Sequence, residues 1–130
     1  MKASFQEYIM AQTIMTVDDS PSMRMLLRAA LGKMGYTIIE AEDGIDAMEK
    51  LSNNRPDLLI TDINMPRMDG FGLIESVRQD DSWRNMPILV LTTETSDEKK
   101  QRARIAGATG WIVKPFSPDK LAAAIRRVLH

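Results

Sequence analysis

The chain has 130 residues, the usual size of one domain, and its net charge of -1 favours neither a nucleic-acid partner nor an anionic membrane. It contains no cysteine, which excludes disulfides and thiolate metal sites and is typical of a reducing compartment. No apolar run approaches the roughly 20 residues that a transmembrane helix needs, so we expect no membrane insertion.

Residues 1–12 lack the long apolar core and the small-residue cleavage site of a secretory signal. We interpret them as a short N-terminal extension of unexplained role, followed by one domain over residues 13–130. The whole is expected to be a cytoplasmic monomer.

The first half of the chain alternates short apolar strands with helices. Ser20-Pro21 begins the first helix, because Ser caps free N–H groups and Pro fits the first helical position, and Gly35 ends it. Asp43-Gly44 and Asp69-Gly70 lead into two further helices, with both aspartates assigned to capping. The strands predicted here are Thr13–Val17, Thr37–Ala41 and Leu58–Thr61.

The second half continues the alternation. A strand over Ile88–Leu91 runs into Thr92, and a polar helix over Asp97–Ala106 follows its cap Ser96. A short strand, Gly110–Val113, and a last helix after Ser117-Pro118 complete the pattern. Five strands alternating with five helices predict an α/β fold, a doubly wound parallel sheet with helices on both faces.

Four of the five strands end in distinctive polar residues. In a parallel sheet these ends share one edge, where open α/β sheets keep their ligands. Residues far apart in sequence therefore converge there. They are Asp18, Asp19, Asp62, Thr92 and Lys114.

Three clustered carboxylates repel one another, and a hard divalent cation would resolve the repulsion. Mg²⁺ takes oxygen ligands and keeps several waters. Asp19, Asp62 and the backbone carbonyl of Asn64 could supply ligands, with Asp18 acting directly or through water.

A metal beside a carboxylate, with a lysine opposite, suits phosphoryl transfer, which depends on positioning and charge neutralisation. Asp62 would be the nucleophile that becomes an acyl phosphate. Lys114 would neutralise phosphoryl oxygens, and Thr92 would donate a hydrogen bond to one. Taken singly, each residue also has a structural explanation: a cap, a strand-end threonine or a solvated lysine.

The chain resembles the receiver domains of bacterial two-component signalling, in particular the single-domain chemotaxis response regulators. The resemblance runs from about Thr13 to Leu129. It is carried by four motifs, VDDS at Val17–Ser20, TDINMPRMDG at Thr61–Gly70, LVLTTE at Leu89–Glu94 and GWIVKPF at Gly110–Phe116.

The resemblance implies the flavodoxin-like (βα)5 fold with strand order 2-1-3-4-5. It implies that a histidine kinase phosphorylates Asp62 and that Asp18, Asp19, Asp62 and the Asn64 carbonyl hold Mg²⁺. Lys114 would pair with the phosphoryl group, and a cis peptide bond would precede Pro115.

Thr92 would be the switch hydroxyl and Trp111 the aromatic residue coupled to it. Receivers usually have Tyr or Phe where this chain has Trp111, and indole is larger, with only an N–H to offer. Trp111 is thus either a moving switch residue or a fixed, partly buried anchor.

The output is expected to pass by protein–protein contact, since no DNA-binding module is predicted. A flagellar-motor protein, a phosphatase or another regulatory partner would receive it, with chemotaxis as the first choice. Alternatives are a phosphate sink or relay receiver, a pseudo-receiver that only binds, and a Mg²⁺-dependent aspartyl-phosphate phosphatase. That enzyme class usually carries a second acid two residues after its nucleophile, where this chain has Asn64. We therefore predict that the chain is not an enzyme beyond assisting its own phosphorylation and dephosphorylation.

Overall fold

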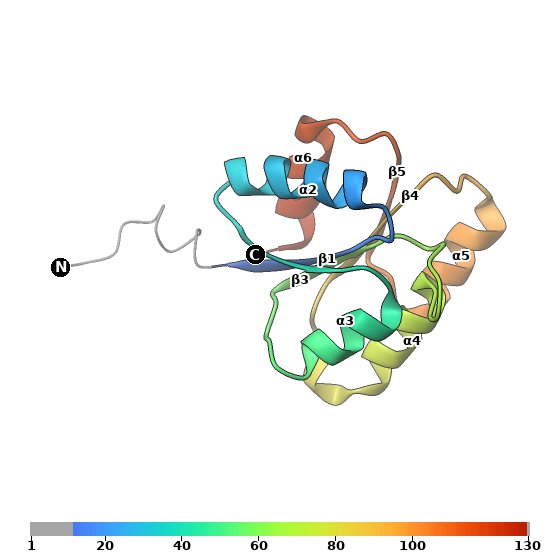
Figure 1. Ribbon diagram of the computed structural model, residues 1–130. Coiled ribbons are helices and arrows are strands. Elements are labelled where there is room, and N and C mark those ends of the chain that lie inside the picture. Colours follow the sequence, from blue (N-terminus) through green and yellow to red (C-terminus); the bar gives the residue numbers. More distant parts are fainter. Residues whose placement is uncertain (1–11, 130) are drawn as a thin grey trace.

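The structure is a computed structural model that describes residues 12–129 (Figure 1). Of the predicted extension, only Gln12 belongs to the described residues. The terminal His130 also lies outside them. The elements in chain order are β1 (Thr13–Val17), α2 (Pro21–Lys33), β2 (Thr37–Ala41), α3 (Gly44–Leu51), β3 (Leu58–Thr61), α4 (Gly70–Gln79), the 3₁₀ helix η1 (Asp81–Trp83), β4 (Ile88–Thr92), α5 (Asp97–Ala106), β5 (Gly110–Val113) and α6 (Pro118–Val128).

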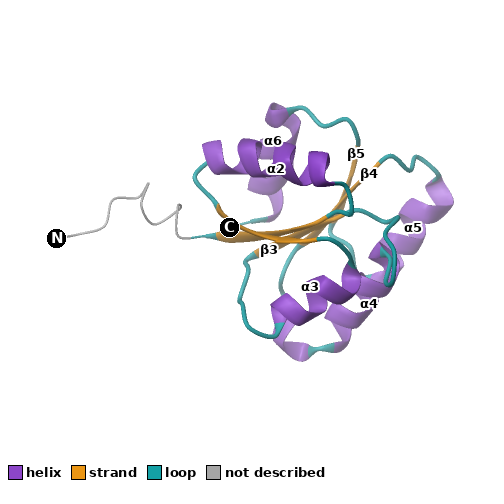
Figure 2. Ribbon diagram, in the orientation of Figure 1, coloured by secondary structure: helices purple, strands orange, loops and turns teal. Residues whose placement is uncertain are grey.

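The five strands form one parallel sheet in the order β2-β1-β3-β4-β5. Figure 2 shows the sheet in orange between two layers of helices. This confirms the doubly wound fold and the order 2-1-3-4-5. The described helices include none that is long and apolar enough to cross a membrane.

Alternate residues of the central strands enter two separate cores, because successive side chains of a strand point to opposite faces. Ile14 of β1 pairs with Leu58 of β3 on one face, and Met15 pairs with Leu59 on the other. Helices α2 and α6 cover the first face, and α3, α4 and α5 cover the second (Figure 1). Since both faces are covered, β3 and β4 are buried along their whole length.

The helix starts follow the predicted caps. In each case the capping side chain accepts a hydrogen bond from a backbone N–H three residues later, which satisfies one of the free donors of the first turn. Gly35, with φ of 95°, follows the end of α2 as expected. The caps are Ser20, Asp43, Asp69, Ser96 and Ser117.

The turn after β3 is closed tightly at Gly70. Its N–H donates to the Ile63 carbonyl at 2.8 Å. A β-carbon at Gly70 would collide with the carbonyl oxygen of Asp62 and lie 2.8 Å from the Ile63 Cα. Both of those neighbours are backbone atoms that cannot rotate away, so glycine lets α4 begin directly behind Asp62.

We expect Gly70→Ala to destabilise the protein by about 1–3 kcal/mol, the usual cost of overpacking. The matched control is Gly32→Ala. Gly32 lies inside α2 with no heavy atom within 4 Å of the added methyl, so this change should stabilise the protein by about 0.5–1 kcal/mol. Urea unfolding measures both, and equal effects of the two substitutions would contradict the assigned role of Gly70.

Candidate functional site

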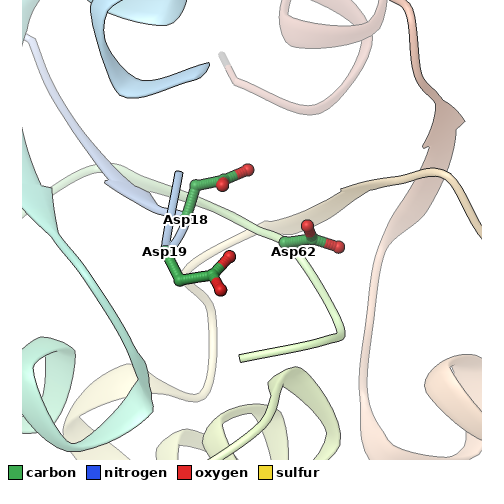
Figure 3. Close-up of side chains that lie close together, drawn as sticks. All are labelled: Asp18, Asp19 and Asp62. Carbon is green, nitrogen blue, oxygen red and sulfur yellow. The ribbon is translucent and has the colours of Figure 1, made fainter. Parts of the chain in front are cut away.

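The carboxyl ends of β1, β3, β4 and β5 meet at one edge of the sheet. Asp18 and Asp19 follow β1, and Asp62 follows β3 at the neighbouring position. Figure 3 shows the three carboxylates side by side at this edge. Thr92 ends β4, one strand further on, and Lys114 follows β5.

Lys114 joins the acidic residues across the site. Its Nζ donates to Asp18 Oδ2 at 2.7 Å and to Asp62 Oδ2 at 2.8 Å. The side chains of the lysine and of Asp18 are 9% and 2% exposed, so this is a nearly buried contact. The Lys114-Pro115 peptide bond is cis, as the sequence resemblance implied.

The pKa of Lys114 is raised above its ordinary value of about 10.5. Burial acts in the opposite direction and is the largest single influence. The hydrogen bonds and charges of Asp18 and Asp62 together outweigh it. Lys114 is therefore a fixed positive charge over the whole physiological range.

The acidic residues could hold a metal ion. Asp18, Asp19 and Asp62 each offer a carboxylate oxygen, and these oxygens lie within 4.8 Å of one another. The donors are all hard oxygens, which fits Mg²⁺. Asp18 is buried and Asp19 is exposed, so the cluster opens toward solvent on the Asp19 side.

Thr92 and Trp111 differ in their surroundings. Thr92 is fully buried, and its hydroxyl accepts a hydrogen bond from the Glu94 N–H at 3.3 Å. Trp111 pairs with Val90 in the sheet and packs, partly buried, against the core under α3, α4 and α5. Whether the indole moves or acts as an anchor stays a prediction.

A polar bridge across the mouth of the site escaped the sequence reasoning. Glu94 Oε1 accepts from the Asn64 side-chain amide and from Lys99 Nζ, each at 3.0 Å. The hydrogen bond from Asn64, followed by that from Lys99, lowers the pKa of Glu94. The ligand role of the Asn64 backbone carbonyl stays a prediction.

A second contact was also missed. Asp43 caps α3 as predicted, but its carboxylate also receives a two-pronged contact from Arg67. No local signal marks this pair, because the two residues are 24 positions apart and lie in separate loops.

The comparisons with known proteins agree with this geometry. The sequence profile of the response regulator receiver domain matches residues 14–126. Chemotaxis protein CheY1 of Helicobacter pylori is 41% identical over 118 residues, which cover 89% of this chain and 95% of that protein. The chain belongs to the response regulator receiver family.

Solved structures give the same assignment. Chemotaxis protein CheY4 of Vibrio cholerae is 44% identical with a TM-score of 0.88, covering 92% of this chain and 99% of that one. The receiver domain of a Pseudomonas aeruginosa sensor histidine kinase, solved with a magnesium ion in its active-site cleft, is 27% identical with a TM-score of 0.84. That match covers 91% of this chain and 97% of the other. The protein is thus a CheY-like receiver of two-component signalling.

The raised pKa of Lys114 predicts how the free energy of unfolding changes at alkaline pH. The folded protein holds this proton more tightly than the unfolded chain, so the stabilisation is complete below pH 10.5 and is lost as pH rises through the folded pKa. The free energy of unfolding of the wild type should fall faster above pH 10.5 than that of Lys114→Met. The difference in slope is at most about 1.4 kcal/mol per pH unit.

Denaturant titrations between pH 8 and 11 measure the difference. The control is Lys33→Met, which removes an exposed lysine at the end of α2 and tests whether the loss of any lysine charge changes the slope. A Lys114→Met profile parallel to that of the wild type would refute the assigned ion pairing.

Proposed function

We propose that Asp62 accepts a phosphoryl group from a histidine kinase and that the phosphorylated chain signals by protein–protein contact. The observation that carries this proposal is the position of Lys114 Nζ, 2.8 Å from the Asp62 carboxylate and 2.7 Å from that of Asp18. A nucleophilic carboxylate beside a fixed ammonium and two further acids is the equipment that aspartyl phosphorylation needs.

In the transfer step an oxygen of the Asp62 carboxylate attacks the phosphorus of a phosphohistidine. The new O–P bond forms as the P–N bond breaks, and the electron pair returns to the imidazole of the kinase. Lys114 faces the negative charge that arrives on Asp62 and offsets it where both side chains are largely buried. Later attack of water on the phosphorus releases inorganic phosphate and restores the carboxylate.

Asp18, Asp19, Asp62 and the backbone carbonyl of Asn64 would hold Mg²⁺. When bound, the ion supplies charge neutralisation for phosphoryl oxygens and for the clustered acids. The all-oxygen cluster supports this assignment. Asp18 already shares Lys114 with Asp62, so the metal and the lysine approach the same acids.

The family and the CheY relatives support the partners that we propose. A chemotaxis-type histidine kinase would supply the phosphoryl group, and a flagellar-motor protein or a phosphatase would receive the output. A phosphate sink or relay role is the second candidate, because it needs the same acceptor site and no motor contact. We further propose that the protein is a cytoplasmic monomer without nucleic-acid or membrane partners.

The opposing proposal is a Mg²⁺-dependent phosphatase with many turnovers. Such an enzyme needs a proton donor for the leaving group. Asn64 cannot serve, and Glu94 is held ionised by Asn64 and Lys99, which lower its pKa. These two residues favour a receiver that is not an enzyme.

The switch would use Thr92, the loop after it, α5 and Trp111. Thr92 lies one strand away from Asp62 and is buried, so its hydroxyl is within the protein rather than in solvent. A phosphoryl group adds charge and acceptor oxygens that would draw this hydroxyl toward Asp62. The surface of α5, β5 and α6 would then change its binding properties.

Acetyl phosphate with Mg²⁺ should add a single phosphate-sized mass to the wild type, read by intact-protein mass spectrometry. Asp62→Asn and omission of Mg²⁺ should each abolish the gain, because the first removes the nucleophile and the second leaves the acids unneutralised. Asp69→Asn retains an N-cap of α4 and is the control that should be phosphorylated normally.

Phosphorylation of Asp62→Asn would exclude Asp62 as the acceptor. No gain in the wild type would call for a phosphorylated histidine kinase as donor, and failure with that donor as well would leave a pure binding module. Continuous release of phosphate from an added phosphoester would establish the enzyme instead.

Thr92→Ala should reach the same extent of phosphorylation as the wild type but lose the conformational response. Trp111 reports that response in a Trp83→Phe background, which removes the other tryptophan. Its fluorescence should change on phosphorylation when Thr92 is present and stay constant in the alanine variant. Loss of phosphorylation itself would contradict the division of roles between Asp62 and Thr92.

A further inference from the structure

The loop behind Asp62 contains a strained backbone turn centred on Arg67. Its φ is +63°, and the Met68 N–H donates to the Pro66 carbonyl two residues earlier at 2.7 Å. A positive φ combined with such a bond matches the rarer, strained form of γ-turn. Glycine or asparagine would suit this position, so the choice of an arginine calls for a reason in its side chain.

The side chain of Arg67 reaches the neighbouring loop. Its Nε lies 2.7 Å from Asp43 Oδ2, and a terminal nitrogen lies 3.0 Å from Oδ1. This is the planar two-pronged geometry that lysine and shorter side chains cannot reproduce. Asp43 is 2% exposed and its pKa is lowered, first of all by the hydrogen bond from Arg67. The pair is therefore anchored on a buried, ionised carboxylate.

A backbone bond runs parallel to this ion pair. The Gly44 N–H donates to the Met68 carbonyl at 3.0 Å, which joins the start of α3 to the residue after Arg67. The loop from Asp62 to Gly70 is thus held at Arg67 and Met68 and closed at Gly70. Asn64 lies between Ile63, which accepts the bond from Gly70, and Arg67.

The loop containing Asp43 also touches the other acidic segment. The Asp18 N–H donates to the carbonyl of Ala41, at the end of β2, at 3.1 Å. The stretch from Ala41 to Asp43 therefore contacts both acidic segments. Asp43 binds Arg67 in the loop after Asp62, and Ala41 binds Asp18. This stretch therefore supports both acidic segments, which are also joined directly where the Asp62 N–H donates to the Val17 carbonyl at 3.0 Å.

We propose that Arg67, paired with Asp43, is a positioning residue that holds the loop of Asn64 in the shape that binds a divalent cation. The inference rests on the proposed function, because it assigns a support for the same acidic site. Arg67 is assigned to neither the metal ligands nor the phosphate-binding residues, because its guanidinium is engaged by Asp43. It acts by keeping a strained loop from relaxing away from Asp62.

Magnesium titration by calorimetry tests the inference without any phosphorylation. Arg67→Ala should raise the dissociation constant for Mg²⁺ about tenfold, the lower end of the effect of removing a residue that orients metal ligands. Asp43→Asn keeps a good N-cap for α3 but removes the charge, and it should have a similar effect. The double variant should be no weaker than either single one, because both changes break the same contact.

Arg28→Ala is the matched control. Arg28 makes the same two-pronged contact with Glu40, at 2.5 and 3.0 Å, between α2 and β2. Its loss removes an equal number of charges and hydrogen bonds and should leave the Mg²⁺ dissociation constant unchanged. Asp43→Asn breaks the same contact without altering the turn at Arg67, so it serves as the second variant if Arg67→Ala is unstable.

Phosphorylation by acetyl phosphate provides a second reading. The Mg²⁺ concentration for half-maximal rate should rise in Arg67→Ala, whereas the rate at saturating Mg²⁺ should stay within about twofold of the wild type. An unchanged Mg²⁺ affinity in folded Arg67→Ala or folded Asp43→Asn would overturn the inference. A wild type that neither binds Mg²⁺ nor accepts phosphate would overturn the proposed function, and the inference with it.

Discussion

The shared ammonium of Lys114 is the interaction on which this edge of the sheet depends. Three strands carry Asp18, Asp62 and Lys114 to one point, and two of the three groups are acids that repel each other. Burying an ion pair costs desolvation energy that the attraction barely repays, whereas removing one partner leaves a buried charge uncompensated. The lysine therefore does little to make the fold stable, and much to offset the repulsion between two acids held side by side. Under the proposed function, a cation would compete with Lys114 for the acids, and a phosphoryl group would compete with the acids for the ammonium. The site would then have two charge arrangements that differ in what surrounds Lys114.

The rest of the architecture supplies a rigid frame around this contact. Strands β3 and β4 are covered on both faces, so Asp62 and Thr92 stand at the ends of elements that cannot easily shift. Helix α5, which follows Thr92, has only Ala103 buried among its ten residues. A helix with so little apolar contact is held weakly and can respond to small forces at its start. The frame thus combines a fixed carboxylate, Asp62, with a loosely held neighbouring helix, which is the combination that the proposed switch would use.

Much of this arrangement was predictable from the sequence, for reasons that differ from residue to residue. The apolar runs ending in Asp18-Asp19, Asp62 and Lys114 placed these side chains at one edge, because parallel strands share their carboxyl ends. Periodicity could not order the strands, since every strand here is a short apolar run, and the order came from family resemblance. The bridge from Glu94 to Asn64 and Lys99 was missed because it joins loops whose approach depends on the assembled fold. The 3₁₀ helix η1 was missed because three residues carry no periodic signal.

Asp43 and Asp69 show that a local sequence pattern does not predict which long-range contacts a residue makes. Both precede a glycine, both begin a helix, and both accept the predicted capping hydrogen bond. Only Asp43 is buried against an arginine from another loop, and nothing in the local sequence separates the two cases. A local motif determines what a residue does for its own helix, whereas its contribution to a site depends on which loop the fold brings beside it. In this protein the loop beside Asp43 is the one that follows Asp62, so a capping residue becomes part of the support of the acidic cluster.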